Sequence, residues 1–181
     1  GAIKGVGGAA IENIIAERDA NGEFKSMDDF VSRIDPFKVN KKVFESLIKA
    51  GCFDEFGFSR KMLLQNVENI VEACKNAAQI RKNAAESLFG EDDSMNDVKI
   101  NFVTINDEFD IKQILKFEQE SVGIYLSGHP LDDYKDEINK IKYTLSSEFE
   151  TLPQSAEILV VGKIEDFSTR ITKSGKKMGT I

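Results

Sequence analysis

The spacing of apolar residues predicts that the first half of the chain is helical. Apolar side chains recur at intervals of three and four residues, the repeat of one helix face, in four segments: 8–20, 26–34, 41–50 and 59–88. Ser26, Asn40 and Ser59 stand where N-caps are expected, and Asn21-Gly22 and Gly51 stand where helices end. The pattern therefore predicts two helix–turn–helix units followed by one long helix that reaches about Leu88.

The second half of the chain changes its pattern twice. Residues 90–109 are acidic and polar, which predicts a linker, with a short strand at VKINFVTI. Helices are expected at about 110–126 and 132–141. The final stretch, EILVVGKIEDFSTRITKSGKKMGTI, is typical of β-structure with a hairpin turn at Ser174-Gly175. We therefore expect a mainly α chain with four parts: 1–89, 90–109, 110–154 and 155–181.

Composition indicates a soluble protein. The chain has 181 residues, of which 30% are charged and 41% apolar, and no apolar run approaches the roughly 20 residues of a membrane span. Two cysteines and one histidine match no metal-ligand spacing, so we expect reduced thiols, no metal and a cytoplasmic location. The chain begins inside a motif and without a signal peptide, which suggests a fragment of a longer protein.

Acidic residues are concentrated in one part of the chain. The net charge is −7, which argues against a nucleic-acid partner. Residues 91–154, however, contain fifteen acidic and six basic residues, whereas residues 1–61 contain ten of each. The two ends are therefore compatible with a nucleic-acid partner, and the acidic residues of 91–154 are interpreted as solvated faces.

The glycine-rich stretch IKGVGGAAIENIIAER allows three interpretations. GVGGAA matches a dinucleotide-binding fingerprint superficially, but helices follow where that motif requires a strand. The stretch could also be a glycine-rich helix start that binds nothing. The third and favoured hypothesis is a helix–hairpin–helix, in which a glycine turn brings backbone N–H groups and the positive end of a helix to a DNA phosphate. The residues predicted to act in this way are Lys4, Gly5, Val6, Gly7, Gly8 and Arg18.

A second turn, DPFKVN, joins the next two predicted helices. Lys38, Lys41 and Lys42 gather at it, and paired hairpins can grip both strands across a minor groove. An ordinary pair of helices with surface lysines is the alternative. On the residues alone, the two interpretations of this turn stay open.

Three separated stretches resemble one protein family. AIKGVGGAAIENIIAERDANGEFKSMDDFVSRID with VNKKVFESLIKAGCFDEFG, EQESVGIYLSGHPLDDY, and EILVVGKIEDFSTRITKSGKKMG resemble the helix–hairpin–helix region, a connecting region and the first OB-domain strands of bacterial replicative DNA polymerase III alpha subunits, the C-family polymerases. The resemblance implies a parent DNA-directed DNA polymerase, a nucleotidyltransferase whose Mg²⁺-binding palm lies outside these residues. This chain itself is then expected to be inactive and to hold no cofactor.

The resemblance also implies partners beyond duplex DNA. AAESLFG stands where the family has an internal sliding-clamp motif; Leu88 and Phe89 fit it, but Ala85 replaces its glutamine. In the incomplete OB segment, single-stranded DNA is expected at Arg170, Lys173, Lys176 and Lys177, and residues 157–181 are expected to be mobile or to pair with another chain. Other replicative polymerase subunits are further expected partners.

These observations favour a part of a polymerase that holds duplex DNA non-specifically and is itself tethered to the sliding clamp. Two other classes stay open. One is a helix–hairpin–helix repair enzyme such as a glycosylase, and the other is a protein-interaction module that docks its partner through the acidic stretch 91–154.

Overall fold

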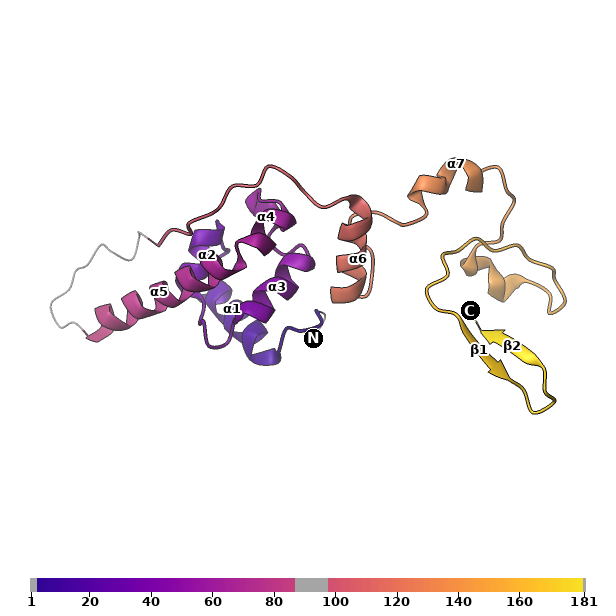
Figure 1. Ribbon diagram of the computed structural model, residues 1–181, viewed down its shortest axis with the longest axis horizontal. Coiled ribbons are helices and arrows are strands. Elements are labelled where there is room, and N and C mark those ends of the chain that lie inside the picture. The colour runs from indigo at the N-terminus through magenta and orange to yellow at the C-terminus, as the bar shows by residue number, and fades with distance from the viewer. Residues whose placement is uncertain (1–2, 87–97, 181) are drawn as a thin grey trace. The chain divides into compact units, whose positions relative to one another are not determined.

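A computed structural model describes residues 3–86 and 98–180 (Figure 1). The chain forms two compact units, Gly1–Ser127 and Gly128–Ile181. The boundary falls inside the predicted part 110–154, because the helix that follows residue 110 packs on the first unit. No helix in the described ranges combines the length and apolar character that a membrane span needs.

The first unit is helical, as predicted. Its helices are α1 (Gly8–Asn21), α2 (Met27–Arg33), α3 (Lys41–Lys49), α4 (Arg60–Gln65), α5 (Val67–Glu86) and α6 (Ile111–Ser121), with a 3₁₀ turn at Asp54–Phe56. The expected caps are confirmed. The side chains of Ser26, Asn40 and Ser59 each accept a hydrogen bond from the backbone N–H three residues later.

The helix predicted from 59 to 88 is not continuous. It is broken at Asn66, whose φ of −99° and ψ of 11° leave the helical range. The Asn66 side chain is buried; its amide nitrogen donates to the carbonyls of Met62 and Val103, and its oxygen accepts from the N–H of Val103. The Asn66 side chain at the break thus satisfies the backbone N–H and carbonyl of Val103. The spacing of apolar residues cannot predict such a long-range contact.

That distant segment is neither the strand nor the loose linker that its composition predicts. Residues 98–110 carry no strand and run as extended chain against the helices. Ile100 is buried and its N–H donates to the Asp28 carboxylate, while the Phe102 ring lies 4.8 Å from that of Phe58, centroid to centroid. Apolar burial and side-chain hydrogen bonds here replace the pairing of a sheet.

The core of the first unit lies between α2, α3 and α5. Phe30 is central: its ring packs edge-on against those of Phe24, Phe44 and Phe53 at centroid distances of 4.8–6.1 Å. Burial of each such side chain stabilises the fold by roughly 1.5–3 kcal/mol. The largest fully buried apolar side chains are Phe44, Met27, Ile34, Ile48, Leu63 and Ile70.

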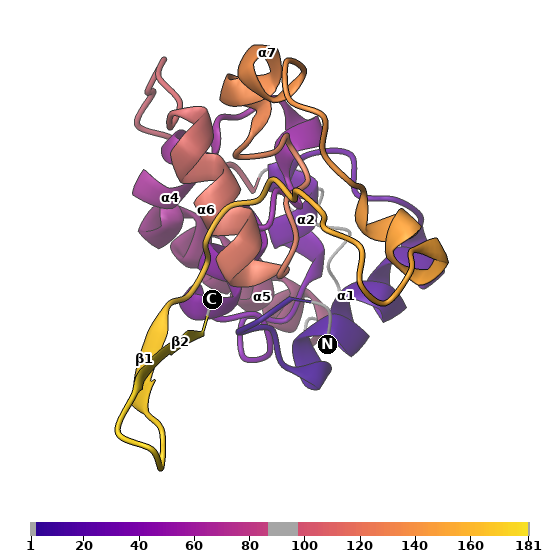
Figure 2. The ribbon, with the colours of Figure 1, turned by 90° about the vertical axis from the view of Figure 1, so that its right-hand side faces the viewer.

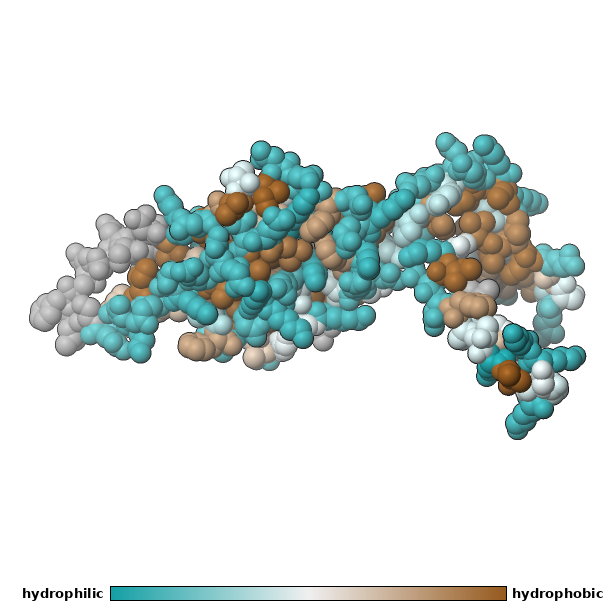
Figure 3. All heavy atoms as spheres, viewed as in Figure 1, coloured by the Kyte–Doolittle hydropathy of each residue, from teal (hydrophilic) through white to brown (hydrophobic). Residues whose placement is uncertain are grey.

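The second unit has little secondary structure. It contains 3₁₀ turns at Asp132–Tyr134 and Ser146–Thr151, the short helix α7 (Lys135–Ile138), and an antiparallel hairpin of β1 (Ser168–Ile171) and β2 (Lys177–Thr180), which is yellow in Figure 2. The predicted turn is confirmed by the φ of +79° at Gly175. No residue between 128 and 180 is buried, and Figure 3 shows brown apolar atoms at the surface of this unit.

Cys74 and Cys52 should differ in reactivity. The Cys74 thiol is fully buried, and this burial raises its pKa to about 12, so on the order of one thiol in 10⁴ is ionised at pH 8. With Cys52→Ser, we expect the native chain to resist a disulfide reagent at pH 8 and to react fully in denaturant. Cys52 is exposed, so Cys74→Ser should leave one thiol that is labelled in the native state. Fast native labelling of Cys74 would contradict the buried environment.

Candidate nucleic-acid interface

The glycine-rich stretch forms an exposed turn at the start of α1. Gly5 has a φ of +87°, which favours glycine, and Gly7 is the N-cap of the helix in an extended conformation. Val6 between them is buried and anchors the turn in the core, whereas Gly5, Gly7 and Gly8 are exposed. Val6 therefore offers only its backbone to a ligand, and the three glycines form the accessible surface.

The backbone N–H groups at the start of α1 are not used within the described part of the fold. Among the described residues, none accepts a hydrogen bond from the N–H groups of Gly7, Gly8 or Ala9. These are N-terminal donors of a 14-residue helix, where the helix dipole favours an anion. The turn can therefore bind a phosphate without any side chain that recognises a base.

Two neighbouring helices hold the turn in place. A Cβ on Gly5 would lie 2.6 Å from the hydroxyl oxygen of Ser46 in α3, so the close approach also requires glycine. On the other side, the N–H of Lys4 donates to the carbonyl of Ser121, the last residue of α6, at 2.7 Å. Lys42 is one helical turn before Ser46 on the same face of α3. The structure thus places the exposed Lys42 on the α3 face that meets the glycine turn.

The other predicted lysines lie at the second turn. Lys38 and Lys41 are exposed beside the start of α3, but the ammonium of Lys41 is paired with the carboxylate of Glu68, which raises its pKa. Neither Lys38 nor Lys42 forms an ion pair with another described residue. Lys42 and Lys38 are therefore freer to meet a phosphate than Lys41.

Some predicted site residues lie elsewhere. Arg18 is ten residues along α1 from Gly8, about 15 Å, and its guanidinium pairs with Asp19. The exposed basic residues Arg170, Lys173, Lys176 and Lys177 belong to the hairpin of the second unit. Ala85 is exposed in the last turn of α5. Leu88 and Phe89 lie outside the described residues.

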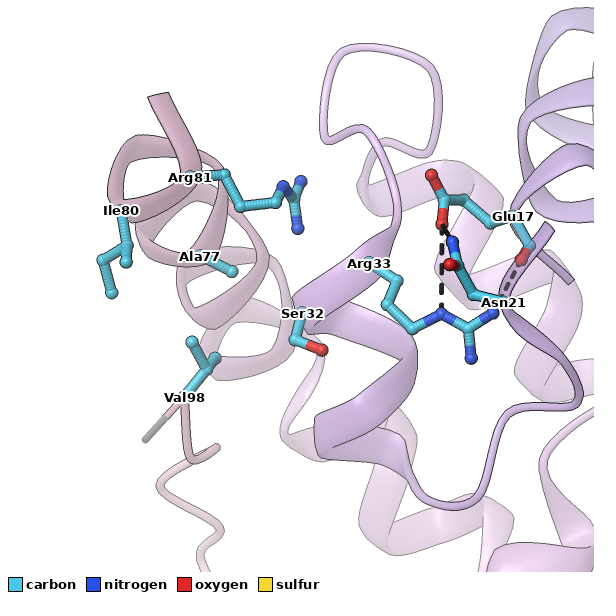
Figure 4. Close-up of a pocket in the computed structure, with 8 residues that line it drawn as sticks. All are labelled: Glu17, Asn21, Ser32, Arg33, Ala77, Ile80, Arg81 and Val98. Atoms are coloured by element: carbon cyan, nitrogen blue, oxygen red, sulfur yellow. Dashed lines mark hydrogen bonds and ion pairs between the residues drawn. The ribbon is translucent and has the colours of Figure 1, made fainter. Parts of the chain in front are cut away.

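The far end of α1 adjoins a pocket between α1, α2 and α5 (Figure 4). Arg33 extends from α2 toward Glu17 and Asn21, and its guanidinium donates to the carbonyls of Glu17 and Gly22. Arg81 donates to the carbonyl of Ile34, just after α2. These arginines stabilise helix C-terminal ends, where cations are favoured. No cluster of three or more potential metal ligands occurs in the described part of the chain.

Comparison with known proteins supports the helix–hairpin–helix assignment. Residues 1–63 match a family model described as a helix-hairpin-helix motif. DNA polymerase III subunit alpha of Campylobacter jejuni is 51% identical over the whole chain. Those of Helicobacter pylori strain J99 and Vibrio cholerae are 41% and 34% identical over 99% of it. The chain is related to a segment of the DNA polymerase III alpha subunit. It spans about 15% of the length of these relatives.

A buried ion pair connects α4 to α6, and it was not predicted from the sequence. Arg60, at the start of α4, donates to both carboxylate oxygens of Asp54 and to Glu118 of α6 at 3.0 Å. The Glu118 side chain is fully buried and also accepts from the N–H groups of Leu126 and Ser127. Burial raises the pKa of Glu118, but hydrogen bonds from Ser127, Leu126 and Arg60 outweigh it and hold the pKa below its ordinary value.

Glu118 is an exception to the interpretation of residues 91–154 as solvated acidic faces, since the other described acidic residues of this range are exposed. A second acid, Glu108, accepts hydrogen bonds from the N–H groups of Arg60 and Lys61 at the start of α4. One signal in the sequence was available. Glu118 falls three residues after Leu115 and four before Val122, within the apolar stripe of its own helix. A charge in that stripe indicates a buried partner rather than a solvated face.

Removal of the Glu118 carboxylate should destabilise the first unit. Glu118→Ala leaves the buried Arg60 guanidinium with Asp54 as its one carboxylate partner, so we expect a loss of about 3 kcal/mol in the free energy of unfolding. Urea denaturation followed by circular dichroism measures it. The double change Arg60→Met with Glu118→Leu should recover part of the loss.

The matched control is Glu120→Ala, two residues away and solvent-exposed on the same helix. It should cost less than about 0.5 kcal/mol. Equal effects of the two alanine changes would show that the buried pair does not hold α6 in place.

Proposed function

We propose that this chain is the part of a replicative DNA polymerase alpha subunit that holds duplex DNA by its phosphates. One observation carries the proposal. The N–H groups of Gly7, Gly8 and Ala9 have no acceptor among the described residues and lie at an exposed glycine turn that begins a long helix. A phosphate oxygen supplies the acceptor and the negative charge that this helix end favours.

The binding is non-specific in its chemistry. Backbone amides and the ammonium groups of Lys4 and Lys42 reach phosphates, which are the same at every base pair. Lys38 adds a charge at the second turn. The whole protein would be a DNA-directed DNA polymerase acting in the cytoplasm, with nucleotidyl transfer and Mg²⁺ in a palm domain outside these residues. This chain would position the duplex.

Two competing classes are less well supported. The relatives are named as polymerase subunits, which favours replication over base excision. A docking role for the acidic stretch is weakened because Glu108 and Glu118 are engaged inside the first unit. Tethering to a sliding clamp through residues 85–89, and contact of the β1–β2 hairpin with single-stranded DNA or other replicative subunits, are further proposals that rest on the sequence motifs and on exposed basic residues.

Gly8→Pro should weaken duplex binding. Gly8 is the first residue of α1, where proline is well tolerated, and the change removes one N–H while keeping the helix. We expect an affinity about tenfold lower, because a charge-assisted hydrogen bond is lost. Fluorescence anisotropy with a labelled duplex measures it.

Gly8→Ala is the matched control because it adds the same Cβ and keeps the N–H. A Cβ at Gly8 meets no atom closer than the Glu12 carboxylate at 4.0 Å. If both variants bind DNA as tightly as the unaltered chain does, this amide does not hold a phosphate.

Lys4→Ala combined with Lys42→Ala should change the salt dependence of binding. Each lost phosphate contact flattens the slope of log K against log salt by about 0.9, and the loss should be equal for duplexes of different sequence. Lys75→Ala with Lys82→Ala removes the same charge from exposed positions of α5 and serves as the control. An equal slope in both double variants would reject the assignment of Lys4 and Lys42.

A further inference from the structure

The two turns of the first unit share a pattern that aligns them residue by residue. α1 begins one residue after its N-cap Gly7, and α3 begins one residue after its N-cap Asn40. Each N-cap directly follows a buried valine, Val6 with 7% and Val39 with 1% of its surface exposed. The second turn therefore has its valine anchor and its helix start at matching positions, although its backbone differs: Gly5 has a φ of +87°, whereas no residue of the second turn has a positive φ.

This alignment assigns different chemistry to the two turns. Lys38 stands at the position of Gly5 and Lys41 at that of Gly8, so the second turn presents side chains where the first presents backbone. Phe37 stands at the position of Lys4, the outer residue of the turn. An apolar ring thus takes the place of the exposed cation of the first turn.

Phe37 is the most exposed large apolar side chain of the described chain, with 93% of its surface accessible. The backbone beneath it is well fixed. The N–H of Phe37 donates to the Asp35 carboxylate at 2.9 Å, and the N–H groups of Lys38 and Val39 donate to the Asp35 carbonyl. Asp35 is tied in turn to α1, since its own N–H donates to the Asn13 side chain. The ring is therefore presented to solvent by a rigid turn.

The surroundings of the ring favour a nucleic acid as its partner. Phe37 contributes nothing to the core, because the buried residues on either side, Ile34 and Val39, make the contacts that anchor the turn. Lys38, the next residue, forms no ion pair with a described residue, while the Asp35 carboxylate accepts a hydrogen bond within the turn. An apolar group beside a cation matches a DNA groove, in which apolar sugar and base edges lie between lines of phosphates.

We propose that Phe37 packs against the sugars and base edges of the minor groove of the duplex whose phosphates the glycine turn holds. The inference rests on the proposed function and adds a contact that carries no charge. The two turns then make different contacts with the duplex. The first binds phosphate through backbone amides, and the second adds an apolar contact with the minor groove.

Phe37→Ala separates this contact from the phosphate contacts. We expect duplex affinity of the full chain to fall about tenfold with the salt slope unchanged, because the ring neutralises no phosphate. Val103→Ala is the control, since Val103 is also apolar and 66% exposed in the same unit. It should bind DNA as the unaltered chain does.

Phe37→Trp gives a direct readout because the chain contains no tryptophan. Addition of a duplex should shift the emission of the indole and reduce its quenching by acrylamide. The same reporter at position 103, Val103→Trp, should be unaffected.

The outcomes distinguish the proposed Phe37 contact from the proposed phosphate contacts. The Phe37→Trp chain could bind duplex by anisotropy while acrylamide quenches its indole as strongly as in the free chain. The Phe37 contact would then be wrong, the phosphate contacts would stand, and the exposed ring would belong to a protein contact. If the unaltered chain binds no duplex at low salt, both proposals fail. Reduced affinity of Phe37→Ala together with a flatter salt slope would also overturn the apolar contact.

Discussion

The arrangement of the first unit depends on the buried ion pair between Arg60 and Glu118. Fifty-eight residues separate the two in sequence, and their pairing holds α6 against the bundle while Glu118 also binds the backbone at 126–127. A buried carboxylate is costly without a cation, and Arg60 is the cation that pairs with Glu118. Gly51 makes the pairing possible, since a Cβ there would lie 2.4 Å from the Arg60 guanidinium. The pair therefore couples the end of α3, the start of α4 and the whole of α6.

This coupling reaches the glycine turn. With α6 in place, the carbonyl of Ser121 accepts the N–H of Lys4, and the ammonium of Lys49 lies 5.4 Å from the centre of the Phe117 ring. The turn is thus held between α6 and α3, with Val6 beneath it and its free donors outward. A ligand site made of backbone needs such support, because amides bind an anion well only when folding has already oriented them. The acidic stretch 91–154 gives the chain a net charge that disfavours DNA binding. The same stretch supplies the Glu118 carboxylate, which holds α6 and through it the glycine turn.

Local chemistry explains which features the sequence predicted. Ser26, Asn40 and Ser59 cap helices through bonds that span three residues. Gly5 in the first turn and Gly175 in the C-terminal hairpin take the positive φ that each turn requires. The missed features all depend on partners far along the chain. Asn66 breaks a predicted helix because Val103 needs its amide, and residues 98–110 pack because Asp28 and Asn66 satisfy their backbone. Phe37 was overlooked for another reason: an apolar pattern assigns aromatic residues to cores, and only the structure shows one left outside.

Under the proposed function, the two turns would hold DNA without selecting a sequence through two different kinds of contact. Amides and lysines bind what is common to all duplexes, and their strength falls as salt rises. An apolar ring in the minor groove is nearly as indifferent to sequence, since that groove presents a degenerate pattern, but its contribution does not depend on counterion release. A grip that combines the two is less sensitive to ionic strength than lysines alone. Under the proposed function it would also leave the protein free to advance along the duplex, because neither turn would contact one particular base.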